Sequence, residues 1–142
     1  MRFKMLSDGC PIALIVSTVA LLFMVPVQAD DLVVDERLQS AMMTQLDLAV
    51  CADTALTFEQ DEVSAERYSD LSIRMLEEAG VVGWTSGDTA TAAVLVMENR
   101  TDIIVHEDDT LEDYRLRNYT GERCERQAAA AQEYLAGSFP SP

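Results

Sequence analysis

The sequence predicts an all-α protein, a small up-and-down four-helix bundle held by one disulfide bond. Three observations lead to this fold class. Apolar residues recur at helical spacing in successive segments, turn-forming residues separate those segments, and two cysteines lie in the first and the last of them. With 142 residues, the chain is close to the usual size of one domain. We therefore expect a single helical domain over residues 30–136, followed by a disordered tail over residues 137–142.

The first 29 residues have the layout of a secretory signal peptide. Arg2 and Lys4 precede an apolar run that ends at Val27, and Ala29 stands just before two aspartates. A charged start, an apolar core and a small residue in this order are typical of a cleaved export signal. We predict cleavage after Ala29 and a location in the periplasm or outside the cell. An uncleaved membrane anchor is the alternative, because about 20 apolar residues can span a bilayer.

The first helix is expected over about residues 34–57. Leu38, Met42 and Leu46 follow one another at four-residue steps there, and the segment contains neither Pro nor Gly. This spacing places the three side chains on one face, as a helix that packs against a core requires. Cys51 falls near the end of this helix.

The second helix is expected to run from Ser64 to Ala79. Its stripe of Tyr68, Leu71 and Met75 is the most regular in the chain. The Ser64 hydroxyl can accept a free backbone N–H at the helix start, and Gly80 can adopt the left-handed conformation that ends a helix. We predict these two residues as the caps.

The third helix is expected from Thr89 to about Ile104, with Asp88 as its N-cap. Its β-branched residues also suit strands, but the segment is longer than an ordinary strand. The connection before it, residues 81–87, holds the only tryptophan, Trp84. This side chain is either an exposed recognition residue or a lid over one end of the bundle.

The fourth helix is expected over about residues 110–136. Thr110 and Asp113 resemble a capping box at its start. From Gly121 onward its predicted inner face is made of small residues and Cys124, which allow a neighbouring helix to approach closely.

Cys51 and Cys124 are the two cysteines that remain after residue 29. An even number of cysteines in an exported chain favours a disulfide, and only one pairing is possible within this chain. A metal or redox pair is less favoured, because the sequence has no C-x-x-C spacing and a single histidine. A disulfide requires Cα atoms within about 7 Å, so the first and last helices should be neighbours.

The charge balance excludes some classes of partner. The formal net charge of the chain is −15, and after residue 29 there are 8 arginines, no lysine and 24 carboxylates, which gives −16. This charge repels nucleic acids and anionic membrane surfaces. A basic exported protein is therefore the partner that we expect, with membrane contact only through an uncleaved signal segment. The oligomeric state stays open.

The stretch from His106 to Asp113 is the densest group of potential ligands. Carboxylates such as Glu107, Asp108 and Asp109 suit calcium, but the stretch lacks the ligand spacing and the mid-loop glycine of an EF-hand. We assign no metal site, no cofactor and no catalytic residue. A small metal-dependent or hydrolytic enzyme centred on this stretch is kept as an alternative function.

These observations favour a non-catalytic interaction or structural module with a protein partner. The alternatives are the small enzyme described above and, if the signal is not cleaved, a membrane-tethered accessory subunit. The export signal, two cysteines and helical periodicity together resemble, in architecture alone, small disulfide-bonded helical proteins of the bacterial periplasm. They assign no family.

Overall fold

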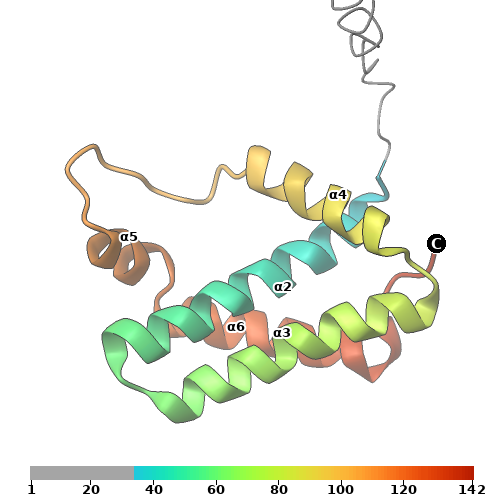
Figure 1. Cartoon of the computed structure of the whole chain (residues 1–142), viewed down its shortest axis with the longest axis horizontal. Coiled ribbons are helices and arrows are strands. Elements are labelled where there is room, and N and C mark those ends of the chain that lie inside the picture. The colour runs from blue at the N-terminus through green and yellow to red at the C-terminus, as the bar shows by residue number, and fades with distance from the viewer. Residues whose placement is uncertain (1–33) are drawn as a thin grey trace, which may run out of the picture. The chain divides into compact units, whose positions relative to one another are not determined.

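The computed structural model describes residues 34–142, so the predicted export signal at residues 1–29 lies outside the described residues. The described part of the chain is all-helical, as predicted (Figure 1). None of its helices is both long enough and apolar enough to cross a membrane. Its elements are α2 (Glu36–Thr54), the π-helical turn η1 (Ala55–Glu59), α3 (Glu62–Val82), α4 (Ser86–Glu98), α5 (Leu111–Asn118), α6 (Gly121–Glu133) and the π-helical turn η2 (Tyr134–Ser138).

The central element is α2, which packs against α3, α4 and α6 (Figure 1). Leu38, Met42 and Leu48 of α2 are fully shielded from solvent, and so are Met75 of α3 and Ala128 of α6. Removing such apolar surface from water contributes about 25 cal/mol per Å². Because neighbours cover α2 on several sides, its buried surface extends around much of the helix.

The predicted disulfide joins α2 to α6. The sulfur atoms of Cys51 and Cys124 are 2.02 Å apart and their Cα atoms are 5.7 Å apart. Ala128 and Ala131, which follow Cys124 along α6, are fully buried. Small side chains at these positions let α6 lie close against the core, which confirms that the first and last helices are neighbours.

The third helix is shorter than predicted. It ends at Glu98 instead of Ile104, and residues 99–110 form an irregular segment. The Asn118 side chain donates to the carbonyl of Ile104 at 2.8 Å and accepts from its N–H at 2.7 Å. The backbone N–H and carbonyl of Ile104 are therefore satisfied by a side chain from α5 without helical hydrogen bonds.

The predicted fourth helix is two helices, α5 and α6. The chain leaves helical geometry at Tyr119, whose side chain is only 5% exposed. Thr120 then starts α6 as its N-cap and accepts a hydrogen bond from the N–H of Arg123 at 3.3 Å. A continuous helix would not provide both the Tyr119 turn into the core and this second cap.

The predicted capping box at the start of α5 is confirmed. Thr110 Oγ1 accepts from the N–H of Asp113 at 3.1 Å, and the Asp113 carboxylate accepts from the N–H of Thr110 at 3.2 Å. Thr85 and Asp88 form the same arrangement at the start of α4. Asp88 is therefore the third helical residue and not the predicted N-cap, because Thr85 supplies the cap three residues earlier.

The second helix begins and ends at other residues than the two predicted caps. Asp61, and not Ser64, is the N-cap of α3, and its carboxylate accepts from the N–H of Ser64 at 3.1 Å. The helix continues past Gly80 and ends at Gly83, whose φ of 110° lies in the left-handed region. The helix stops where this conformation is adopted, and a glycine without a Cβ adopts it at no steric cost.

The last residues of the chain differ from the predicted disordered tail. Phe139 is 7% exposed, and its ring lies 5.8 Å from that of Tyr134. Pro140 is also buried, and its carbonyl accepts a hydrogen bond of 2.6 Å from the indole N–H of Trp84. Phe139 thus packs on Tyr134 of its own segment, and the hydrogen bond from Trp84 holds the tail against the connection between α3 and α4.

Candidate functional site

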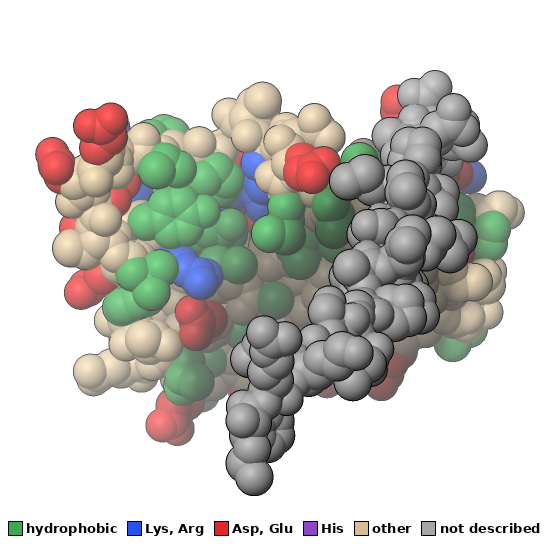
Figure 2. Space-filling model, turned by 45° about the horizontal axis from the view of Figure 1, so that its top comes forward, with side chains coloured by type: hydrophobic (Ala, Val, Ile, Leu, Met, Phe, Trp, Pro, Cys, Tyr) green, Lys and Arg blue, Asp and Glu red, His purple; other side chains and the backbone are tan. Residues whose placement is uncertain are grey.

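A half-open hollow lies between α2 and the part of the chain that runs from the end of α4 to α6. Figure 2 shows apolar side chains gathered on this face, with arginine side chains among them. The volume of the hollow is about 460 Å³, which lies within the roughly 300–1,000 Å³ of small-molecule sites. Nine residues line the hollow, none of them acidic: Leu46, Val50, Met97, Arg100, Ile103, Val105, Tyr114, Arg115 and Tyr119.

The outer wall of the hollow is the irregular segment 99–110. Two contacts with α5 hold this segment in place. Asn118 binds the backbone of Ile104, as described above, and Arg117 pairs with the carboxylate of Asp109. The hydrogen bond from Arg117 lowers the pKa of Asp109 to about 2, so this ion pair persists at neutral pH.

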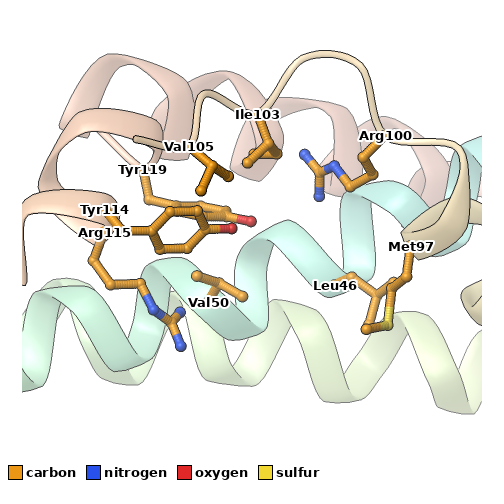
Figure 3. Close-up of a pocket in the computed structure, with 9 residues that line it drawn as sticks. All are labelled: Leu46, Val50, Met97, Arg100, Ile103, Val105, Tyr114, Arg115 and Tyr119. Carbon is orange, nitrogen blue, oxygen red and sulfur yellow. The ribbon is translucent and has the colours of Figure 1, made fainter. Parts of the chain in front are cut away.

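Two tyrosines form the aromatic side of the hollow. The rings of Tyr114 and Tyr119 are 6.4 Å apart and meet edge to face, and Figure 3 shows both hydroxyl groups extending toward the middle of the hollow. Burial raises the pKa of Tyr119 to about 12. The guanidinium carbon atoms of Arg123 and Arg115 lie 5.2 Å and 5.9 Å from the centre of the Tyr119 ring. This side of the hollow is therefore aromatic and Tyr119 stays uncharged at neutral pH.

Behind the hollow lies a group of ionised side chains centred on a buried carboxylate, which we term the ionic cluster. Asp47 of α2 is fully shielded from solvent. Its carboxylate accepts from Arg100 Nη1 at 2.5 Å, from Arg123 Nη2 at 2.7 Å and from Gln127 Nε2 at 3.0 Å. Asp102 also pairs with Arg100 and Arg123, so two carboxylates balance two guanidinium groups. The ionic cluster thus ties the outer wall to both α2 and α6.

Two members of the ionic cluster, Asp102 and Arg100, keep their charges at neutral pH. Hydrogen bonds from Arg100 and Arg123 hold the pKa of Asp102 well below its ordinary value, although partial burial acts in the opposite direction. Burial acts to lower the pKa of Arg100, but the hydrogen bonds to Asp102 and Asp47 outweigh it and raise that pKa. Arg100 lines the hollow with its charge already balanced.

Arg115 is the second guanidinium at the hollow, and its charge is less completely paired than that of Arg100. Figure 3 shows Arg100 and Arg115 on opposite sides of the tyrosine rings. The nearest carboxylate to Arg115 is that of Asp53, with Nη2 and Oδ2 3.5 Å apart. The Nε and Nη1 atoms of Arg115 are buried and have no hydrogen-bond partner among the described residues. Arg115 therefore brings an incompletely satisfied positive charge to the edge of an apolar hollow.

This arrangement suits binding better than proton transfer. Tyr119 and Arg100 both have raised pKa values, so they keep their protons near neutral pH. Arg100 can then only donate hydrogen bonds, whereas the Tyr119 hydroxyl can donate and accept them. General acid–base catalysis works best with groups whose pKa lies near the working pH. The hollow offers apolar surface, hydrogen-bond donors and positive charge.

The acidic stretch that the sequence singled out lies on the surface. Glu107 and Asp108 are exposed, whereas Asp109 pairs with Arg117 and accepts from the backbone N–H of His106 at 3.0 Å. Within residues 34–142, no three His, Cys, Asp or Glu side chains come together in a group that could hold a metal ion. His106 is exposed and lies outside the residues that line the hollow.

Trp84, for which the sequence allows either a recognition role or a lid over the bundle, is also away from the hollow. It lies between α3 and α4, is partly buried against the core, and donates its indole N–H to the carbonyl of Pro140. In this position Trp84 covers one end of the core.

Sequence reasoning missed Asp47 and Arg115. One signal for Asp47 was present, because residue 47 lies one helical turn before Cys51 and so shares the face that meets the last helix. A carboxylate on that face needs a cationic partner. Nothing in the sequence distinguishes Arg115 from the neighbouring arginines of the same segment.

The arginines of the described residues are all paired with carboxylates. Each of the eight in residues 34–142 forms an ion pair with an Asp or Glu. The same residues contain 22 carboxylates, of which eight take part in these pairs and 14 do not. The charge that is left over on the described part of the chain is therefore negative.

No protein-family model, curated protein or solved structure matches this chain. The chain's own residues therefore carry the functional inference.

Proposed function

We propose that this protein is an exported, non-catalytic interaction module that binds a basic protein partner. The pairing of all eight arginines of residues 34–142 with carboxylates is the observation that carries the proposal. It leaves 14 carboxylates without an arginine partner in the same residues, so the surface presents uncompensated negative charge. Such a surface speeds encounter with a positively charged partner and discriminates against acidic ones.

Many of these carboxylates gather at one end of the molecule. They come from the start of α3 and from the segment that leads into α5, which Figure 1 places at the same end. The contact of Arg115 in α5 with Asp53 near the end of α2 agrees with this placement. We term this region the acidic end, and its residues are Glu59, Asp61, Glu62, Glu66, Glu107, Asp108, Glu112 and Asp113.

Two further features support export and a binding role. The first 29 residues have the layout of a signal peptide, and a disulfide between Cys51 and Cys124 suits an oxidising compartment. The groups with raised pKa at the hollow, Tyr119 and Arg100, hold their protons near neutral pH, which favours binding over acid–base chemistry.

A capture experiment with charge-matched variants tests the proposal. The oxidised protein is immobilised and exposed to the exported protein fraction of the cells that produce it. Bound proteins are identified by mass spectrometry, and the amount of each is measured. One variant neutralises exposed carboxylates of the acidic end, E62Q/E66Q/E107Q/D108N. The other, E77Q/E78Q/E98Q/E133Q, removes the same number of unpaired carboxylates elsewhere. Asp61 and Asp113 are left intact because they cap helices.

We expect one basic protein in stoichiometric amount on the wild type and on the second variant. The first variant should lose it, and so should the wild type at high salt, because salt screens exposed charges. Equal retention by both variants, or an acidic partner, would contradict the proposal. Substantial turnover of a hydrolase substrate that is lost in H106A would favour the enzyme alternative. Recovery of a chain that begins at Asp30 from the soluble exported fraction would exclude the membrane-tethered one.

A further inference from the structure

The hollow exposes apolar surface that a ligand could cover. Met97 and Val105, which stand at its rim, are 67% and 70% exposed. Covering apolar surface contributes about 25 cal/mol per Å². The hollow is concave, has an aromatic side made by Tyr114 and Tyr119, and is large enough for a small molecule.

The charge at the hollow selects an anionic group. None of its nine lining residues is acidic, although the chain as a whole carries a net charge of −15. Arg115 has two buried guanidinium nitrogens without an acceptor among the described residues. A buried donor without a partner is costly, and a carboxylate can accept in parallel from Nη2 together with either Nε or Nη1 of a guanidinium. The 3.5 Å contact with Asp53 is longer than an ordinary hydrogen bond, so turning the guanidinium toward the hollow gives up little.

The same charges limit the ligand to a single negative group. Arg100 is already engaged by Asp47 and Asp102, so Arg115 is the guanidinium that is left for a ligand at the hollow. A second negative group would find no further free guanidinium at the hollow and would add to the net negative charge of residues 34–142. A phosphate monoester or a dicarboxylate is therefore disfavoured relative to a monocarboxylate.

We infer that the hollow binds a small amphipathic monocarboxylate, with its carboxylate on Arg115 and its apolar body against the tyrosines and the aliphatic side chains. The ligand is a free small molecule. This site uses residues outside the acidic end and needs no protein partner, so it stands or falls separately from the proposed function.

Calorimetric titration with a charged ligand and its neutral isostere tests the inference. The probes are octanoate and octanamide, which differ in the head group and share the apolar tail, and the protein is the oxidised form recovered from the producing cell. We expect one-to-one binding of octanoate, about ten-fold tighter than that of octanamide. A hydrogen bond between charged groups strengthens binding by about this factor relative to a neutral one. The variant R115Q should lose this preference, because its affinity for octanoate should fall while its affinity for octanamide stays the same.

Matched variants separate a binding role from a structural one. R74Q removes an arginine with an equally long ion pair, 3.6 Å to Asp70, that lies on α3 and does not line the hollow. V105D places a carboxylate at the rim, whereas V94D does so at an exposed position of α4 that does not line the hollow. We expect R74Q and V94D to bind octanoate like the wild type and V105D to bind it about ten-fold more weakly. Because Val105 is 70% exposed, V105D tests the site even where R115Q disturbs folding.

Three outcomes would overturn the inference. The first is the absence of saturable octanoate binding up to about 5 mM. The second is equal affinity for octanoate and octanamide in the wild type. The third is a parallel loss of both ligands in R115Q, since a purely structural role of Arg115 would weaken both alike.

Discussion

The buried carboxylate of Asp47 lies 2.5 Å from Nη1 of Arg100, although 53 residues separate the two in the chain. Asp47 belongs to the middle of α2, whereas Arg100 stands two residues beyond the end of α4, where the irregular segment begins. Asp47 also binds Arg123 of α6. One charge in the core therefore fixes where the outer wall of the hollow starts.

Replacing Asp47 with Asn should destabilise the protein strongly. The substitution keeps the shape of the side chain but leaves Arg100 and Arg123, which are 12% and 14% exposed, short of one negative charge. Removing one partner of a buried ion pair typically costs about 3–5 kcal/mol. We expect a loss of about 3 kcal/mol in the free energy of unfolding, measured by urea denaturation followed by circular dichroism.

The matched control for this prediction is D70N. Asp70 forms an exposed ion pair with Arg74 at 3.6 Å, and such pairs contribute about 0–1 kcal/mol. Equal effects of D47N and D70N would show that the ionic cluster does not hold the fold.

The stability that Asp102 contributes should depend on pH. Hydrogen bonds from Arg100 and Arg123 lower its pKa below the ordinary value of 3.8 in the folded state. The folded protein thus binds this proton less tightly than the unfolded chain, so the contribution is present above about pH 4 and is lost as the pH falls through the lower folded value. We expect D102N to be less stable than the wild type at pH 7 and the difference to shrink below about pH 4.

Denaturant midpoints of both proteins across this pH range measure the effect. D108N serves as the control, because Asp108 is exposed and pairs with none of the arginines in residues 34–142. A difference between D102N and the wild type that stays constant from pH 7 to acid would contradict the prediction.

The loss of the disulfide should cost several kcal/mol. Cys51 and Cys124 close a loop of 73 residues, and the chain-entropy model assigns such a loop about 4 kcal/mol of stabilisation through the unfolded state. We expect C51A/C124A to lower the free energy of unfolding by about this amount, with helical content kept in the absence of denaturant. Reduction of the wild type should have a similar effect, and an unchanged denaturant midpoint after reduction would argue against it.

The helices that the sequence predicts best are those with long uninterrupted stripes. Leu38, Met42 and Leu46 in α2 and Tyr68, Leu71 and Met75 in α3 follow helical spacing, and both helices are found. The disulfide could be predicted because only two cysteines follow residue 29 and because the chain is expected to be exported. Caps are less predictable, because Asp61 and Ser64 are both good capping residues and only the backbone path decides which of them accepts the N–H.

The errors arise where a tertiary contact replaces local hydrogen bonding. Residues 99–104 contain no Pro or Gly that would end α4. Asn118 binds Ile104 and the ionic cluster binds Arg100, and these contacts together favour an extended path. Likewise, Tyr119 turns into the core and breaks the predicted fourth helix. The hollow could not be predicted, because its walls are brought together by these same long-range contacts.

Removing the Phe139 side chain should loosen the C-terminal segment and expose Trp84. Phe139 is 7% exposed and lies beside Tyr134, while the next residue, Pro140, accepts the hydrogen bond from the Trp84 indole. Truncation of a buried Phe to Ala typically costs about 3–5 kcal/mol, and because this site is at the edge of the core we expect about 3 kcal/mol. The fluorescence of Trp84, the only tryptophan, should shift to the red in F139A as water reaches the indole.

L56A is the control, since Leu56 is 56% exposed and its truncation should change stability by less than about 0.5 kcal/mol. Unchanged Trp84 emission in F139A would mean that the contact between tail and indole does not depend on Phe139.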